Sequence, residues 1–449
     1  MRLIDAIPVS EESRIAFVGA GGKSTAMFRL AHQAHEKGVR TILLSATTHL
    51  AMEQLAWADR HLVVTTPEDL RELAGEPLGG VVLLTGEPGE DMRAQGISLE
   101  LISEVDQLAR EKSAALLVEA DGSRLRPLKA PADHEPVIPA WVGEVVVVAG
   151  MSGMGQTLTS DTVHRPHLFG ELSKLQPGEL IGPDSLVRVL VSEDGGLKGM
   201  PPAARRVALL NQCDSPTLAA QAKQMSGKLL SSYGQVVVSQ FASSSNEEVL
   251  AVHRRLAGVV LAAGGSARLG QPKQLLDWQG KPFVRAVAET ALAAGLSPVV
   301  VVTGAYQQEV EPELDGLPVR LVNNPNWLDG QASSVRAAVK LINEELPEVY
   351  GALFFLVDQP QISVELVSTL VGAYSESLSP IVAPMVDDRR GNPVLFDRST
   401  FTALSRLEGD SGGRQVFSKF RIRYVPWLDA KAGMDVDTME DYQRLIEEN

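Results

Sequence analysis

A glycine-rich stretch with two cations is the first segment whose residues could do chemistry. The apolar residues 258–261 predict a buried strand, and residues 262–273 continue as AAGGSARLGQPK. Small residues let backbone N–H groups approach an anion, while Arg268 and Lys273 can offset the charge of a triphosphate. The segment therefore predicts a phosphate-binding loop. We expect the backbone beside the nucleotide to be that of Leu261, Ala262, Ala263, Gly264 and Gly265.

Carboxylates follow later in the same half of the chain. Asp358 comes directly after the apolar run 352–357, so its side chain should lie at the carboxyl edge of a sheet, where open α/β sheets bind ligands. Asp435 and Asp437 alternate along an extended segment and would point to one side. Mg²⁺ prefers such oxygen ligands. We predict a magnesium site on Asp358 and one of the two later aspartates, which the residues alone do not separate.

This set of groups suits transfer of a nucleotidyl group to a phosphate. A phosphate monoester is already ionised at neutral pH, so its attack on an α-phosphorus needs no general base from the protein. Positioning and charge compensation can supply the catalysis. We expect the catalytic residues to be Arg268, Lys273 and Asp358, with no covalent intermediate and no catalytic histidine.

A second glycine loop lies near the N-terminus. The strand candidate 15–18 runs into GAGGKST and then into a helix candidate, an order that resembles a P-loop. The match is incomplete, because the first glycine of G-x-x-x-x-G-K-[ST] falls at Phe17. The alternative is a plain glycine turn that leaves Lys23 exposed. The predicted phosphate-binding residues are Gly19, Gly21, Gly22, Lys23, Ser24 and Thr25.

Two later segments support a nucleotide at this loop. The apolar run 116–118 ends at Glu119 and Asp121, where a metal-holding acid would face a P-loop. The segment NQCD at 211–214 resembles a base-reading element, in which Asn211 and Asp214 could contact a guanine edge. Gln212 replaces the expected lysine, so ATP and GTP both stay candidates. The polar stretch 129–135 is predicted to be a functional loop.

Apolar runs alternate with helical stretches along the whole chain, which predicts two α/β sheets covered by helices. Strand candidates of the first half are 14–18, 41–44, 81–84, 115–118, 145–148 and 206–210, with helices at 24–37 and 100–111. The rhythm restarts at 258–261, 298–302, 319–322, 352–357 and 381–383. A serine-rich stretch at 241–246 and a helix candidate at 247–256 separate the halves. We predict domains at 1–250 and 251–449.

Composition limits the classes of partner. The chain has 449 residues, a formal net charge of -15 and a single cysteine, Cys213. The negative charge argues against broad binding to nucleic acid or anionic membranes, and one thiol excludes an internal disulfide. No apolar run is long enough to span a membrane, and the first residues lack the pattern of a secretion signal. We expect a cytoplasmic protein with small-molecule ligands.

The second half resembles the MobA-like nucleotidyltransferases, especially molybdenum cofactor cytidylyltransferases. The shared motifs are LAAGGSARLGQPKQLL at 261–276, NPNWLDGQASS at 324–334, VDQP at 357–360, GNPVLF at 391–396, GDSGGR at 409–414 and DVDTMED at 435–441. The resemblance implies a Rossmann-like fold, a Mg²⁺ cofactor, and CTP and molybdenum cofactor as substrates. It makes Asp437 the stronger second metal ligand and adds Gly330 and Ser334 to the nucleotide site. It also implies an acceptor site at Gly391, Asn392, Pro393 and Arg414.

Two positions bear on the substrates. Guanylyltransferases of this superfamily tend to read LAGG where this chain has LAAG, so Ala263 favours CTP over GTP. Many relatives carry histidine in place of Asn392, which leaves the acceptor open. A sugar or alditol phosphate is the alternative acceptor, and a guanylyltransferase the alternative nucleotide class.

The first half resembles the YqeC family through the segments 19–25, 47–49, 118–124, 127–136 and 164–166. Members of that family are regarded as accessory proteins of selenium-dependent molybdenum hydroxylases. The resemblance implies a P-loop-like α/β domain that uses ATP or GTP in maturing such an enzyme, with the hydroxylase apo-enzyme as partner. The alternative from another class is a non-catalytic module for binding or delivery.

Overall fold

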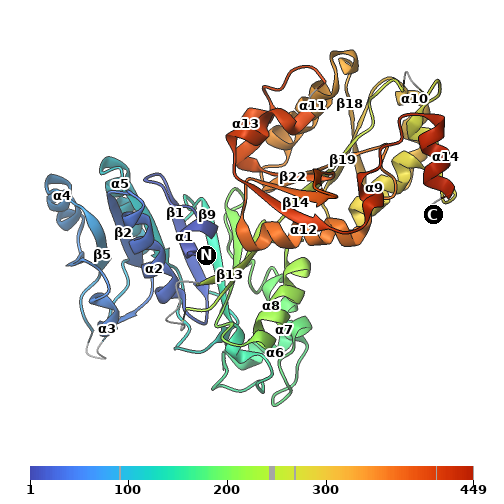
Figure 1. Ribbon diagram of the computed structural model, residues 1–449. Coiled ribbons are helices and arrows are strands. Elements are labelled where there is room, and N and C mark those ends of the chain that lie inside the picture. The colour runs from blue at the N-terminus through green and yellow to red at the C-terminus, as the bar shows by residue number, and fades with distance from the viewer. Residues whose placement is uncertain (90–92, 242–247, 267–268, 411, 448–449) are drawn as a thin grey trace. The chain divides into compact units, whose positions relative to one another are not determined.

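The structure of the protein is a computed structural model, which describes residues 1–89, 93–241, 248–266, 269–410 and 412–447. The chain forms two compact units, Met1–His253 and Arg254–Asn449, shown in Figure 1. The boundary predicted from the sequence lies after residue 250, and the two units of the structure divide after His253. Within the described residues, no helix is both long and apolar enough to cross a membrane.

The first unit is built on a nine-stranded sheet with the strand order β13-β12-β11-β9-β1-β7-β2-β5-β4. The pairings that join the strands from β12 to β4 are all parallel. The strands are β1 (Arg14–Gly19), β2 (Thr41–Ala46), β4 (Arg60–Val63), β5 (Gly80–Thr85), β7 (Ala115–Glu119), β9 (Glu144–Gly150), β11 (Arg205–Asn211), β12 (Gln235–Ser239) and β13 (Val249–Arg254). Shorter pairs are β3 (Leu50–Ala51) with β6 (Arg93–Ala94) and β8 (Leu128–Lys129) with β10 (Val163–His164).

Helices pack on this sheet through apolar faces. Towards the β4 edge, Leu116 and Val118 of β7 join a cluster with Ile102 and Val105 of α5. Towards the β13 edge of the same face, β9, β11 and β12 share a cluster with Leu186 of α7 and with α8, and the two clusters meet where Ala16 pairs with Val118. The helices are α1 (Leu3–Ala6), α2 (Lys23–Glu36), α3 (Met52–Leu55), α4 (Pro67–Gly75), α5 (Leu99–Glu111), α6 (Pro166–Ser173), α7 (Pro183–Leu190) and α8 (Pro216–Leu229).

The second unit is built on an eight-stranded sheet with the order β18-β17-β14-β19-β22-β20-β21, in which β23 also pairs with β20. β18, β17, β14 and β19 run parallel, while β22 is antiparallel to both β19 and β20. The strands are β14 (Leu256–Leu261), β17 (Val299–Thr303), β18 (Val319–Asn323), β19 (Gly351–Leu356), β20 (Ile381–Val386), β21 (Arg389–Arg390), β22 (Val394–Asp397) and β23 (Ile422–Trp427).

Alternation along β14 divides the core of the second unit into two layers. Val260 packs in a cluster with Phe283 of α9 and Leu366 of α12, while Val259 packs with Val335 of α11. The longer helices are α9 (Phe283–Ala293), α11 (Gln331–Glu345), α12 (Val364–Ser377) and α14 (Met439–Glu447), and short elements include β15 (Asp277–Trp278), β16 (Lys281–Pro282), α10 (Gln307–Val310) and α13 (Phe401–Leu404). The α/β class predicted for both halves is confirmed.

One predicted element is wrong. Residues 247–256 are predicted to form a short charged helix, but the structure has the strand β13 (Val249–Arg254) there, on the edge of the first sheet beside β12. In the strand, Val249 and Val252 are buried and His253 is partly buried. Long-range pairing with the sheet outweighs local helix propensity in so short a segment.

Candidate functional site

The loop after β14 in the second unit is held from behind by a side chain that the sequence did not single out. Gln274 is fully buried, and its Nε2 donates to the carbonyl oxygens of Ala262 at 2.9 Å and Gly264 at 2.7 Å. The loop is also tied to the next strand, because the Ala262 N–H donates to the Val302 carbonyl at 2.9 Å. One amide therefore fixes the backbone of the predicted phosphate loop.

Replacing Gln274 by leucine tests this support. The change removes both N–H donors, and the buried Ala262 carbonyl left without a partner costs about 1–3 kcal/mol. We expect Gln274→Leu to lower the free energy of unfolding in urea and to weaken nucleotide binding by about tenfold or more. The exposed Gln308→Leu is the matched control. Wild-type stability and nucleotide affinity in Gln274→Leu would count against the supporting role.

The two ends of the second unit meet at Lys273. Its Nζ lies 2.8 Å from Asp358 Oδ2 and 3.0 Å from Asp437 Oδ1. Asp358 follows β19, and Asp437 lies just before α14, where its N–H donates to Asp441 Oδ2 at 3.3 Å. Burial opposes the charged form of Lys273, but the two carboxylates raise its pKa above the ordinary value. The ammonium is therefore charged and held between the predicted metal ligands.

The carboxylates at this point fit a divalent cation. Asp358 Oδ1 is buried and has no hydrogen-bond partner among the described residues, a costly state that a metal ion would relieve. Asp435, by contrast, accepts a hydrogen bond from Gln359 Nε2 at 2.7 Å. Burial first, and then Asp358 and Asp437, raise the pKa of Asp435. Asp437, which contacts Lys273 beside Asp358, is therefore better placed than Asp435 to act as a second ligand.

No set of three or more His, Cys, Asp or Glu side chains in the described part of the chain could hold a metal ion. Two carboxylates would leave most of the coordination shell to other oxygens. Mg²⁺ commonly binds through one or two carboxylates together with substrate phosphates and water. The residues therefore suit a cation that arrives with a nucleotide.

The predicted nucleotide residues line one cavity of about 350 Å³. Trp327, Leu328 and Asp410 also line it. The predicted site residues that line this cavity are Leu261, Ala263, Gly264, Gly265, Lys273, Gly330, Ser334 and Asp358. Ala262 is buried behind the loop. Arg268, the remaining predicted catalytic residue, lies outside the described residues.

Gly330 and Ser334 owe their positions to neighbours. Gly330 has φ +89°, and a Cβ there would lie 2.3 Å from Asp410 Oδ1, so the close approach requires glycine. The buried Asn324 donates through Nδ2 to Ser333 Oγ at 2.7 Å and Ser334 Oγ at 3.0 Å. Asn324 belongs to the quoted motif, but no sequence pattern distinguishes it from its neighbours.

A larger cavity of about 1200 Å³ adjoins the first. Both are lined by Leu261, Gln331, Leu356 and Asp410. Of the predicted acceptor residues, Gly391, Asn392 and Arg414 line the larger cavity, while Pro393 does not. Asp437 lines it as well, so the predicted metal site lies where the two cavities meet.

In the first unit, the glycine loop between β1 and α2 is tightly packed. Gly19, Gly21 and Gly22 all have positive φ, and a Cβ on Gly19 would lie 2.2 Å from the Val148 carbonyl oxygen. Lys23 is only 4% exposed, and its Nζ donates to the Gly19 carbonyl at 2.8 Å. The alternative of a glycine turn with an exposed Lys23 is therefore wrong.

Carboxylates surround this lysine. Lys23 Nζ lies 3.5 Å from Glu119 Oε1 and 3.4 Å from Asp121 Oδ1. Ser24 Oγ donates to Glu119 Oε2 at 2.6 Å, and the Gly19 N–H donates to Asp121. Burial opposes the charge on Lys23, but Asp121 and Glu119 raise its pKa. The predicted lysine, hydroxyl and acids of the loop thus meet at one edge of the sheet.

The other predicted residues divide into two groups. Asn211 Nδ2 donates to the Gly21 carbonyl at 2.8 Å, so this asparagine braces the loop. Thr25 and Asp214 make no side-chain hydrogen bond or ion pair with the described residues, and Asp214 is exposed. Thr47, which follows β2, was missed as a site residue. Its N–H donates to the Glu119 carbonyl at 3.0 Å, and its buried Oγ1 has no hydrogen-bond partner within the described ranges.

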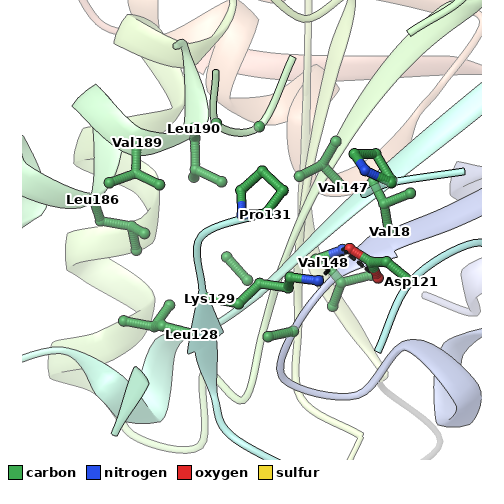
Figure 2. A pocket seen from close by; sticks show the side chains of 16 residues that line it. Val18, Asp121, Leu128, Lys129, Pro131, Val147, Val148, Leu186, Val189 and Leu190 are labelled. Carbon is green, nitrogen blue, oxygen red and sulfur yellow. Dashed lines mark hydrogen bonds and ion pairs between the residues drawn. The ribbon is translucent and has the colours of Figure 1, made fainter. Parts of the chain in front are cut away.

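An ionic network of buried and partly buried side chains extends from this loop, and Figure 2 shows its contact between Lys129 and Asp121. Lys129 Nζ lies 2.8 Å from both Asp121 Oδ2 and Glu135 Oε2, and Glu135 in turn receives two hydrogen bonds from Arg165. Burial opposes ionisation of Glu135, but Arg165 and Lys129 lower its pKa to about 2. The network connects the predicted functional loop at 129–135 to the glycine loop.

The pKa of His164 depends on the charged groups of this network. His164 pairs in register with Lys129, and burial, then Arg165 and Lys129, lower its pKa from 6.5 to about 4, against an opposite effect of Glu135. Between pH 6.5 and 4 the unfolded chain binds this proton and the folded chain does not, so the free energy of unfolding decreases as the pH is lowered. We expect His164→Gln to flatten this fall in urea unfolding, unlike the exposed His167→Gln. A wild-type pH dependence in His164→Gln would contradict the prediction.

Comparisons with known proteins agree with this division of the chain. Residues 15–167 match the family model described as YqeC protein, and residues 258–424 match the MobA-like NTP transferase domain. The Escherichia coli (strain K12) protein named "Uncharacterized protein YqeC" is 32% identical over 206 residues, which cover 45% of this chain and 77% of that protein.

Two further relatives are similar over about the same length. The Paenarthrobacter nicotinovorans protein named "Nicotine blue oxidoreductase" is 37% identical over 204 residues, covering 42% of this chain and 95% of that protein. The Bacillus cereus (strain Q1) protein named "Probable molybdenum cofactor guanylyltransferase" is 28% identical over 196 residues, covering 41% and 93%. The resemblance to both families is confirmed: the chain belongs to the YqeC family in its first part and to the MobA-like NTP transferase family in its second.

Proposed function

We propose that the second unit transfers the cytidylyl group of CTP to the phosphate of molybdenum cofactor and releases pyrophosphate. The observation that carries this proposal is Lys273, held between Asp358 and Asp437 where two adjoining cavities meet. The smaller cavity suits the nucleotide and the larger one the acceptor.

Each group has a task in this reaction. The loop at 262–265, braced by Gln274, would bind the nucleotide through its backbone, and Lys273 would neutralise phosphate charge. A magnesium ion on Asp358 and Asp437 would offset the negative charge that develops on the phosphate oxygens. The acceptor phosphate attacks the α-phosphorus, the bond to the β-phosphate breaks, and pyrophosphate carries away the electron pair. Arg268 is proposed to share in this charge compensation.

Nucleotide choice rests on Ala263, which lines the nucleotide cavity. Its side chain favours CTP by the motif resemblance, whereas the name of the Bacillus cereus relative favours GTP. Pyrophosphate release should be measured with magnesium, molybdenum cofactor and CTP, GTP or ATP in parallel. Release that needs both CTP and cofactor supports the proposal. Release only with GTP would identify the enzyme as a guanylyltransferase. Release only with a sugar or alditol phosphate would identify that compound, and not molybdenum cofactor, as the acceptor.

A redox reaction is the alternative from another class, because one relative is named as an oxidoreductase. The same assay separates the two, since a redox enzyme would release no pyrophosphate.

For the first unit, we propose that ATP or GTP binds at Gly19–Lys23 with Ser24, Glu119 and Asp121, during maturation of a molybdenum hydroxylase. The convergence of Lys23, Ser24 and two buried acids supports the proposal, and Thr47 Oγ1 offers a further oxygen ligand beside Glu119. Each nucleotide should raise the melting temperature of the wild type with magnesium, and not that of Lys23→Met. Binding without hydrolysis would favour a delivery module, and no shift with any nucleotide would exclude the site.

A further inference from the structure

Three arginines line the larger cavity, Arg389, Arg390 and Arg414, and the same cavity is lined by Asp388, Asp410 and Asp437. All three arginines are exposed, and none forms an ion pair with the described residues. By contrast, the exposed Arg444 and Arg320 of the same unit form ion pairs, Arg444 with Asp441 at 2.6 Å and Arg320 with Glu345 at 3.0 Å. A group of unpaired arginines in a chain with a net charge of -15 makes their part of the cavity a local site for an anion.

Arg390 differs from Arg389 and Arg414 because its guanidinium packs on a series of aromatic rings, the aromatic column of Phe417, Phe396 and Phe354. Its Cζ lies 4.8 Å from the centroid of the Phe417 ring. Phe417 also stacks on Phe396, with centroids 6.0 Å apart and an interplanar angle of 11°. Phe396 in turn meets the edge of Phe354 at 5.6 Å. All three rings are buried, so they form a rigid support for the cation.

The backbone of Arg390 is fixed as well. β21 pairs with β20, with Arg390 opposite Met385, and the next N–H, that of Gly391, donates to the Pro384 carbonyl at 3.0 Å. The side chain therefore starts from a defined point and ends on a defined ring. Such preorganisation reduces the entropy lost when a ligand is bound.

This geometry decides what the column can recognise. Phe417 is already engaged by two partners, because its ring stacks on Phe396 and contacts the guanidinium of Arg390. A guanidinium that stacks through its face keeps its N–H donors in plane at the edges. Those donors match the oxygens of a phosphate, which arginine binds in bidentate fashion.

We propose that Arg390 is a specificity-determining residue that binds the phosphate monoester of the acceptor, with Phe417 as the positioning residue that holds it. This proposal rests on the proposed function and names the group that the larger cavity recognises. Arg389 and Arg414 add positive charge but lack a comparable aromatic support among the described contacts. Arg390 should therefore dominate recognition.

The test is a calorimetric titration of the full chain with glycerol 3-phosphate, after a non-hydrolysable CTP analogue and magnesium have filled the nucleotide site. We expect Arg390→Ala to weaken binding by about tenfold or more, and Arg390→Lys to restore little of it, because an ammonium makes no bidentate contact. Phe417→Leu should lose affinity several-fold. Arg423→Ala removes an exposed arginine that does not line the cavity and should bind like the wild type.

Equal affinity in the wild type and Arg390→Ala, or no binding by the wild type, would overturn the assignment of Arg390. The titration involves no turnover, so its result is independent of the reaction. A wild type that binds the phosphate through Arg390 but transfers no nucleotide would refute the proposed function and leave the anion site standing. Transfer with an unchanged acceptor KM in Arg390→Ala would support the proposed function and refute the role of Arg390.

Discussion

Asp358→Ala should lower the rate of nucleotidyl transfer by roughly 10³-fold while the protein stays folded. The loss is expected because Asp358 is the proposed metal ligand that follows β19, with one oxygen on Lys273 and the other buried without a partner among the described residues. Stability should change little. A partly exposed ion pair contributes about 0–1 kcal/mol, and removing an unsatisfied oxygen relieves part of that loss.

The measurement combines pyrophosphate release with urea unfolding. Asp315→Asn is the matched control, since Asp315 is exposed and lies outside both cavities. Asp358→Asn should behave like Asp358→Ala, because an amide keeps the shape but loses the charge. Retained activity in either variant would refute the metal-ligand assignment, and loss of the folding transition would show a structural role instead.

Lys273→Met should weaken apparent nucleotide affinity by about 10–100-fold, with a smaller effect on acceptor binding. The methionine keeps much of the apolar stem but removes the charge that lies between Asp358 and Asp437. Without the ammonium, two neighbouring carboxylates repel each other and repel the triphosphate. Nucleotide binding should therefore need a higher magnesium concentration than in the wild type.

Calorimetric titration with CTP across a series of magnesium concentrations checks this result. Lys340→Met changes an exposed lysine outside the cavities and should leave the affinity unaltered. An unchanged nucleotide affinity in Lys273→Met would remove Lys273 from the phosphate site.

Motif residues were predictable because their chemistry is local in the sequence. The glycine loops follow strands, and Asp358 follows β19, so strand ends alone place them at the sheet edge. The different partners of Asp435 and Asp437 could not be predicted, because Gln359 donates to the first and Lys273 to the second from distant parts of the sequence. Sequence spacing carries no information on such partners.

The supporting residues could not be selected from the sequence for the same reason. Gln274 and Asn324 act through hydrogen bonds to residues nine to twelve positions away, and such amides show no periodic pattern. The column of Phe354, Phe396 and Phe417 brings three segments together only after the sheet has formed. The helix predicted at 247–256 was wrong for the same reason, because the strand β13 that forms there is set by its place in the sheet and not by local sequence.

The central claim is transfer of a nucleotidyl group to an acceptor phosphate, and the product of one reaction tests it most directly. The full chain should be incubated with CTP labelled at the α-phosphorus, magnesium and molybdenum cofactor, and the product identified by mass spectrometry. We predict a cofactor–cytidine dinucleotide that carries the label in its pyrophosphate linkage and is absent in Asp358→Ala. Label that stays in CTP, or appears only in free CMP whether or not the cofactor is present, would contradict the account.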